Sequence, residues 1–262
     1  MTVTHSNVLH THGLNVSVEG ARVLHNVSVD IMSGTCTALL GPNGSGKTTF
    51  IRAVLGLIAS SGEVRWFGAQ EQDYRATGRV SLVPQLLPAA NAVPVSVAEF
   101  VESAFTSPAN RLSKWRHRAH RAQALHSALS RVGLLDKADR PVNALSGGEQ
   151  RRALFARAIV TGADVVLMDE PLAGVDLDHQ AQLVAIMSSM LESGATLVVV
   201  AHELDAMADI VDQVVLFGGV GQSSVVYQGA PSPEVLHRHL AHEPHHIHEL
   251  QRPESTGSML EL

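Results

Sequence analysis

The chain has 262 residues, 45% of them hydrophobic, which is enough to bury a sizeable core in one or two domains. It carries 19 Lys and Arg residues against 25 Asp and Glu residues, a formal net charge of −6 that gives no electrostatic basis for a nucleic-acid partner. The opening residues lack the basic stretch and apolar run of a secretory signal, and no apolar segment approaches the roughly 18 residues of a transmembrane helix, so we expect a cytosolic protein.

Apolar and polar residues alternate in two segments near the start of the chain, residues 8–32 and 62–68. Leu14, Val16 and Val18 belong to this pattern. Such alternation is typical of half-exposed antiparallel strands. We therefore expect a small antiparallel β subdomain here.

Several short runs rich in Val and Leu are apolar without alternation. They cover residues 35–40, 80–83, 165–168, 196–201 and 214–217. Continuous apolarity fits strands buried on both faces of a mainly parallel sheet, which predicts an α/β core. The single cysteine, Cys36, lies in the first run, and we interpret it as a reduced core residue.

The strand-like runs stop between about residues 96 and 160, where the text becomes helical. This pattern predicts a helical subdomain inserted in the core. We expect the whole domain, core and insertion together, to span residues 1–230. From residue 231 to residue 262 the chain is polar and rich in histidine, which predicts a flexible C-terminal tail.

The first candidates for a functional site are the residues that follow the apolar runs, because open α/β sheets bind ligands beyond the carboxyl ends of their strands. These residues are Gly41, Gln85, Asp169, Glu170 and His202.

A glycine-rich segment with the pattern of a P-loop follows the first of these runs and opens a helical stretch. It consists of Gly41, Pro42, Asn43, Gly44, Ser45, Gly46, Lys47, Thr48 and Thr49. The glycines let backbone amides turn toward an anionic phosphate at the start of the helix. Lys47 can reach the terminal phosphates of a nucleotide, and the Thr48 hydroxyl can bind Mg²⁺. The alternative is a flexible glycine turn without a ligand.

Two adjacent carboxylates, Asp169 and Glu170, end a later apolar run. The first can hold Mg²⁺ and the second can polarise a water molecule. Paired acids are also common as solvated loop charges. Their position after a P-loop favours the functional interpretation.

A third motif, LSGGEQRR at residues 145–152, lies about 20 residues before the acidic pair and resembles the signature of ABC ATPases. Ser146 can cap a helix that starts near Glu149, and Gly147 and Gly148 then expose amides at its positive end. Together with the motifs above, this segment makes the chain similar to that family from about residue 8 to residue 230.

The resemblance implies ATP and Mg²⁺ as ligands and a homodimer of ATPase subunits. In such a dimer Ser146, Gly147 and Gly148 of one subunit close over the ATP that the P-loop of the other subunit binds. One triphosphate does not need both phosphate sites of a single chain, which agrees with this arrangement.

The resemblance also assigns roles to single residues. Glu170 becomes the catalytic base, and His202 contacts the γ-phosphate and the attacking water. Gln85 joins the shell of Mg²⁺ and water and communicates with the membrane subunit, and Asp176 contacts the other subunit. Many members place an aromatic ring against adenine where this chain has Val18.

The segments VPQLLPAANAVPVSVAEFV and DEPLAGVD are similar to those of the zinc and manganese importer branch. This implies an ATPase that lies at the cytoplasmic face of the inner membrane and energises the import of a divalent metal ion, zinc or manganese. An integral-membrane permease would contact residues 86–107, and an extracytoplasmic solute-binding protein would act indirectly. The alternatives are a transporter for another substrate, such as a metal chelate, and a soluble ABC ATPase outside transport.

The predicted tail adds a possible Zn²⁺ site, because imidazole nitrogens bind this metal. The 15 histidines of the chain include a cluster within the tail: His237, His239, His242, His245, His246 and His248. A solvated tail without metal is the alternative.

Overall fold

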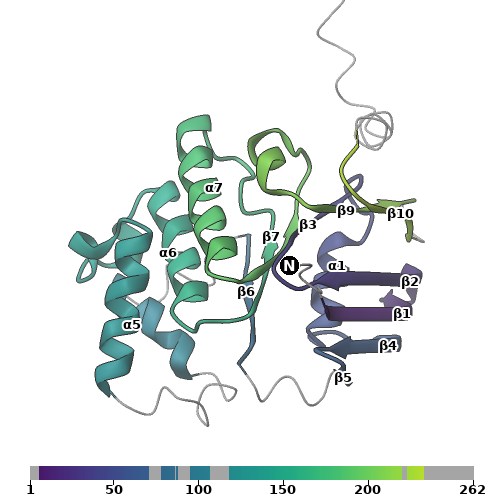
Figure 1. Cartoon of the computed structure of the whole chain (residues 1–262), viewed down its shortest axis with the longest axis horizontal. Coiled ribbons are helices and arrows are strands. Elements are labelled where there is room, and N and C mark those ends of the chain that lie inside the picture. The colour runs from purple at the N-terminus through teal and green to yellow at the C-terminus, as the bar shows by residue number, and fades with distance from the viewer. Residues whose placement is uncertain are drawn as a thin grey trace, which may run out of the picture.

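The computed structural model describes residues 6–70, 78–85, 87, 95–106, 118–219 and 223–232. These residues form two sheets with helices on both sides of the larger one (Figure 1). The architecture is α/β, as the apolar runs predict. The predicted histidine cluster and most of residues 86–107 ahead of position 95 lie outside the described residues.

The smaller sheet is antiparallel, with strand order β2-β1-β4-β5. Its strands are β1 (Asn7–Val18), β2 (Ala21–Met32), β4 (Ser61–Trp66) and β5 (Ala69–Gln70). Leu14 and Val16 are buried, which confirms the alternation there, whereas Val18, the last residue of β1, is 44% exposed. The prediction of a strand over residues 62–68 is wrong at its C-terminal end, where β4 stops at Trp66. Phe67 and Gly68 turn the chain there, with φ angles of 52° and 78°.

The larger sheet has strand order β10-β9-β3-β8-β7-β6. Its strands are β3 (Cys36–Leu40), β6 (Val80–Val83), β7 (Val165–Asp169), β8 (Thr196–Val200), β9 (Gln213–Gly218) and β10 (Ser224–Gly229). All neighbours pair in parallel except β9 and β10, so the predicted mainly parallel sheet is confirmed. The sequence did not predict β10, the antiparallel edge strand.

Helices complete both layers. They are α1 (Lys47–Val54), α3 (Val97–Glu102), α5 (Arg118–Arg131), α6 (Gly147–Ile159) and α7 (Leu177–Glu192), with short 3₁₀ turns η1 (Ser103–Thr106), η3 (Leu135–Lys137), η4 (Val142–Ala144) and η5 (Asp205–Ile210). Every element described between β6 and β7 is helical, although the boundaries of the subdomain stay a prediction. Within the described part of the chain, no helix has both the length and the apolar character needed to cross a membrane.

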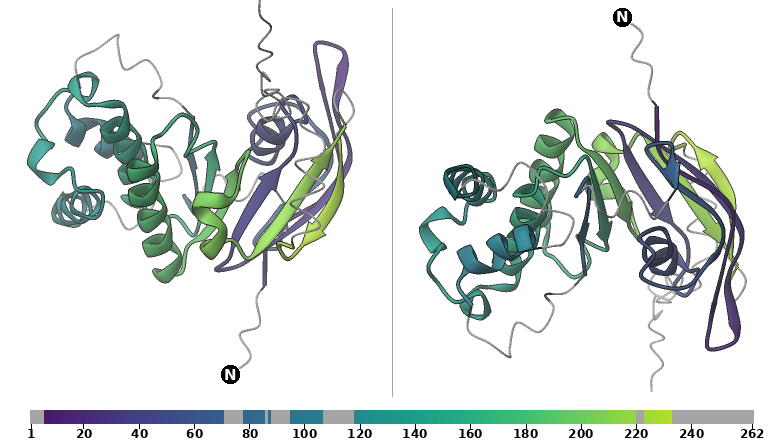
Figure 2. Two further views of the ribbon diagram at one scale, coloured as in Figure 1. Left: turned by 90° about the horizontal axis from the view of Figure 1, so that it is seen from above. Right: turned by 90° about the horizontal axis from the view of Figure 1, so that it is seen from below.

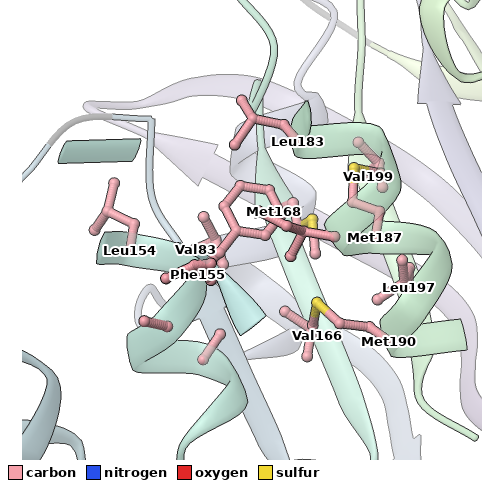
Figure 3. Close-up of a cluster of buried hydrophobic side chains, with 14 of the residues drawn as sticks. Val83, Leu154, Phe155, Val166, Met168, Leu183, Met187, Met190, Leu197 and Val199 are labelled. Atoms are coloured by element: carbon pink, nitrogen blue, oxygen red, sulfur yellow. The ribbon is translucent and has the colours of Figure 1, made fainter. Parts of the chain in front are cut away.

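The four central strands of the larger sheet, β9, β3, β8 and β7, are buried on both faces because successive side chains enter different cores. Met168 and Val166 of β7 pack beneath α6 and α7, against residues such as Phe155 and Met187 (Figure 3). Leu167 points to the other side, where α1 and the antiparallel sheet cover it. Figure 2 shows α1 between the two sheets, with α6 and α7 across the larger sheet from it.

Candidate active site

The P-loop follows β3 and depends on glycine at two close approaches. Gly41 has φ of 142°, and a Cβ atom there would lie 2.5 Å from the Phe217 carbonyl oxygen. Gly46 has φ of 84°, and a Cβ atom there would lie 2.6 Å from Leu24 Cδ2. Gly46 is also the residue before α1, so the loop delivers the chain directly to a helix N-terminus.

Polar groups inside the loop suit an anionic ligand. Lys47 is buried, and its Nζ donates to the carbonyl oxygens of Gly41 at 2.5 Å and Pro42 at 3.0 Å. Ser45 Oγ is buried and has no hydrogen-bond partner among the described residues. An ammonium held at the loop and an unsatisfied hydroxyl beside it fit a phosphate group. Asn43 is exposed on the loop, and Thr49 lies half-buried in α1.

The structure brings the two predicted Mg²⁺ ligands together from distant parts of the chain. Thr48 Oγ1 donates to Asp169 Oδ1 at 2.8 Å. Burial raises the pKa of the Asp169 carboxyl, and the Thr48 hydrogen bond opposes this shift. A hydroxyl and a carboxylate at this distance form a donor set that Mg²⁺ prefers.

Glu170 follows β7 in the left-handed region, with φ of 50°. Gln85 Nε2 donates to its Oε2 at 2.7 Å, and His202 Nε2 lies 2.9 Å from its Oε1. The second contact is a hydrogen bond when the imidazole carries its proton on Nε2. The predicted catalytic residues therefore meet at the carboxyl edge of the parallel sheet, beside the Thr48–Asp169 pair.

The signature residues lie at the N-terminus of α6. Ser146 is the N-cap of α6, and its Oγ accepts from the Glu149 amide while the Glu149 carboxylate accepts from the Ser146 amide. The helix begins at Gly147, two residues before the predicted start. Lys137 pairs with Glu149, and this hydrogen bond, followed by that of the Ser146 amide, lowers the pKa of the Glu149 carboxyl to about 2.

Asp176 lies close to the signature within the same subunit. It is the N-cap of α7, and both its carboxylate oxygens lie 2.7 Å from His179 Nδ1. Hydrogen bonds from the His179 side chain and amide lower the pKa of Asp176. The His179 ring covers the Cα atom of Gly148, where a Cβ atom would lie 2.8 Å from its Cδ2.

A pocket of about 440 Å³ joins these parts of the chain. Its lining includes Gln85, Ser146, Gly147, Gly148, Asp176 and His179. No residue of the P-loop lines it, and Figure 1 shows α6 and α1 on opposite sides of β7. The chain thus presents two separate phosphate-binding candidates, with Gln85 and Glu170 between them.

Sequence reasoning missed the side chains that hold these parts together. Arg151 and Gln180 bind the loop between Glu170 and Asp176, and His179 joins Asp176 to the signature. Only His179 has a local signal, the Asp-x-x-His spacing of a helix N-cap. Contacts of Arg151 with residues about 20 positions later depend on tertiary packing and leave no such signal.

The sequence pattern of the ABC transporter family matches residues 24–173, which include the P-loop, the signature and the acidic pair. The chain belongs to the ABC transporter family. ATP hydrolysis coupled to transport is the activity of this ABC ATPase. Its relatives include a probable metal transport system ATP-binding protein of Chlamydia pneumoniae, 36% identical over 82% of each chain.

Two further relatives of this ABC ATPase have names that state a metal. The zinc transport system ATP-binding protein TroB of Treponema pallidum is 37% identical over 74% of this chain and 72% of its own. The manganese transport system ATP-binding protein MntB of Bacillus subtilis is 33% identical over 74% of this chain and 76% of its own.

Solved structures show the same fold. CbiO1 of Clostridium perfringens, part of an ABC transporter complex, superposes with a TM-score of 0.74 at 23% identity, over 89% of this chain and 92% of that one. An ATP-binding cassette in its ADP conformation gives a TM-score of 0.76 at 22% identity, over 91% of this chain and all of that one.

Proposed function

We propose that the P-loop of this ABC ATPase binds the phosphates of ATP, with Lys47 at the terminal phosphates and Thr48 and Asp169 holding Mg²⁺. Bound Mg²⁺ neutralises phosphate charge. Glu170 orients the attacking water and accepts its proton, while His202 and Gln85 hold the Glu170 carboxylate. The observation that carries this proposal is the convergence of Gln85 and His202 on Glu170, beside the Thr48–Asp169 contact.

We further propose that two copies of the chain form the working ATPase. Each copy offers a P-loop site and, on the far side of β7, the Ser146–Gly148 helix N-terminus with Asp176 beside it. Within one chain the P-loop does not line the pocket of the signature and Asp176, which supports a homodimer in which the P-loop of one copy faces the signature of the other across the bound nucleotide.

The proposed cargo is a divalent metal ion, zinc or manganese. The relatives named for zinc or manganese transport support this proposal, since they align over about three quarters of the chain. The proposed partners are an integral-membrane permease, which would anchor the subunit at the cytoplasmic face of the membrane, and indirectly an extracytoplasmic solute-binding protein. Residues 86–107 remain the proposed permease contact.

The cargo is tested by metal uptake in cells that carry either the wild-type chain or Lys47→Ala. We expect the variant to lose accumulation of one of the two metals when both are scarce, because ATP can no longer drive import. Arg131→Gln, at the end of α5 and outside the P-loop, serves as the control. Equal zinc and manganese uptake in all strains would favour a transporter for another substrate, such as a metal chelate.

A separate proposal concerns the tail, which would chelate Zn²⁺ through its histidine cluster. The six histidines that fall between positions 237 and 248 support this proposal. The test compares Zn²⁺ titrations of the full chain with those of a chain ending at Ala230. Zn²⁺ should change the ATPase rate of the full chain but not that of the truncated chain. The affinity of the tail for Zn²⁺ should fall as the pH drops through about 6.5, because each imidazole ligand must be deprotonated. Equal responses would contradict a regulatory tail.

A further inference from the structure

The loop between Glu170 and Asp176 is held by side chains rather than by regular structure. Arg151 Nη1 donates to the carbonyl oxygens of Glu170 at 3.1 Å and Pro171 at 2.9 Å, and its Nη2 donates to that of Ala173 at 2.5 Å. From the other side, Gln180 Nε2 of α7 donates to Val175 at 2.9 Å. The backbone of this loop is therefore fixed from two helices.

Arg151 contacts the loop where its conformation is least favourable. Glu170 has a φ angle of 50°, in the left-handed region that residues other than glycine rarely adopt. Such a conformation persists only when surrounding contacts enforce it. The Glu170 carbonyl oxygen is one of the three acceptors of Arg151. The Glu170 carboxylate is attached to this backbone and is also held by Gln85, which follows β6, and by His202, which follows β8. Its position therefore depends on the backbone that Arg151 contacts as well as on these two partners.

Arg151 also belongs to the helix that Ser146 caps. It lies in the second turn of α6, so one guanidinium joins the helix of the signature to the backbone of Glu170. We propose that Arg151 is a positioning residue for hydrolysis: it fixes the backbone of Glu170 and ties the orientation of the carboxylate to the signature helix. The inference rests on the proposed roles of Glu170 and of the signature in the dimer.

The chemistry of arginine explains why this residue can do so. Its planar guanidinium presents several N–H donors in fixed directions, which matches three carbonyl oxygens spread over four residues. A lysine offers one nitrogen atom and cannot span them. Glutamine has one donor nitrogen with two hydrogens on a shorter side chain, so it can bind at most two of the three carbonyl oxygens.

The test compares the full-length chain with Arg151→Gln, Arg151→Lys and the control Arg131→Gln. Arg131 provides a matched control because its Nη2 likewise holds a backbone carbonyl, at the C-terminal end of α7. It donates to the Ser189 carbonyl oxygen at 2.9 Å and to the C-cap residue Ser193, at its Oγ, at 3.2 Å. ATPase rates, KM for ATP and thermal unfolding midpoints are measured for each protein.

Arg151→Gln should lower kcat by about tenfold or more, because displacing a catalytic group by 1 Å can cost about 10²-fold. KM for ATP should change by a smaller factor than kcat, since the hydrogen bonds of Arg151 go to the loop between Glu170 and Ala173 rather than to the P-loop. Arg151→Lys should give an intermediate rate and covers the case in which the glutamine variant does not fold. Arg131→Gln should change the unfolding midpoint without changing kcat.

A second readout separates positioning from loss of structure. Arg151→Gln is combined with Glu170→Gln, and single-turnover hydrolysis of radiolabelled ATP is followed. If Arg151 acts through Glu170, the double variant should be no slower than Glu170→Gln alone. Additive losses, or wild-type kcat in both Arg151 variants, would overturn the inference. If Glu170→Gln itself hydrolyses ATP at the wild-type rate, the proposed function fails instead.

Discussion

Neighbouring glycines of the signature have different surroundings. A Cβ atom at Gly147 would meet nothing within 4 Å, whereas one at Gly148 would lie 2.8 Å from His179 Cδ2. Both positions are in the first turn of α6, where alanine is favoured over glycine by up to about 1 kcal/mol. The His179 ring, held by Asp176, should decide the sign of the effect at Gly148.

We therefore expect Gly147→Ala to raise the free energy of unfolding by about 0.5–1 kcal/mol. Gly148→Ala should lower it by about 1 kcal/mol, because His179 must move. Urea denaturation of the two variants measures the difference. In a His179→Ala background the loss at Gly148 should disappear, and an equal gain for both variants would contradict the His179 contact.

Asp169 shows how a binding site conflicts with stability. Burial raises its pKa, so the folded chain binds this proton more tightly than the unfolded chain does. The stability contributed by the protonated form is present below the ordinary pKa near 3.9 and is lost as the pH rises through the higher folded pKa. Without Mg²⁺, the ionised carboxylate should weaken the fold at neutral pH.

Asp169→Asn should therefore be more stable than the wild type at pH 7 in EDTA, and this advantage should vanish at low pH. The asparagine oxygen can still accept from Thr48, but Mg²⁺ with ATP should no longer raise the unfolding midpoint. Denaturation curves at several pH values test this. Asp209→Asn, at an exposed position, is the control. If both variants show the same change in stability with pH and the same response to Mg²⁺ with ATP, the proposed role of Asp169 is contradicted.

At the scale of elements, two capping boxes in the helical layer differ by one cation. Glu149 caps α6 with Ser146 and pairs with Lys137, which with the cap lowers its pKa to about 2. Glu99 forms the same box with Ser96 at α3, where the hydrogen bonds of the cap alone lower its pKa. Both pKa values are depressed, so both carboxylates stabilise the fold above their ordinary pKa, and this stability is lost as the pH falls.

Glu149→Gln should cost more stability than Glu99→Gln at pH 7, and Ser146→Ala should cost about 1 kcal/mol. The cost of Glu149→Gln should shrink as the pH falls from about 4.3, the ordinary value for glutamate, toward 2. Urea denaturation between these pH values measures it. A cost that does not change with pH would contradict the ion pair.

The sequence predicts the elements better than their contacts. Continuous apolar runs correctly predict β3, β6, β7, β8 and β9 within about one residue, because burial on both faces leaves a local pattern. β10 is missed, since its half-exposed residues pair with β9 only in the folded chain. The left-handed backbone at Glu170 is also missed, because its contact with Arg151 comes from a helix about 20 residues earlier in the chain.

At the scale of the whole molecule, the motif order predicts which residues belong to the site, and the structure adds how they are divided. Thr48, Asp169, Glu170, Gln85 and His202 meet at one edge of the sheet. The signature and Asp176 line a pocket without the P-loop. This division, which no spacing in the sequence reveals, is the structural reason to expect that ATP binds between two copies of the chain.

The most direct test is the oligomeric state and hydrolysis rate of Glu170→Gln with Mg²⁺ and ATP, measured by light scattering on a sizing column and by phosphate release. We expect hydrolysis to slow by about 10²-fold or more, because a positioned base contributes that much, and the variant to elute as a stable dimer only when ATP is present. Ser146→Glu in the same background should abolish this dimer, since its carboxylate would repel the phosphates. A Glu170→Gln chain that hydrolyses ATP at the wild-type rate, or stays monomeric with ATP bound, would contradict the account.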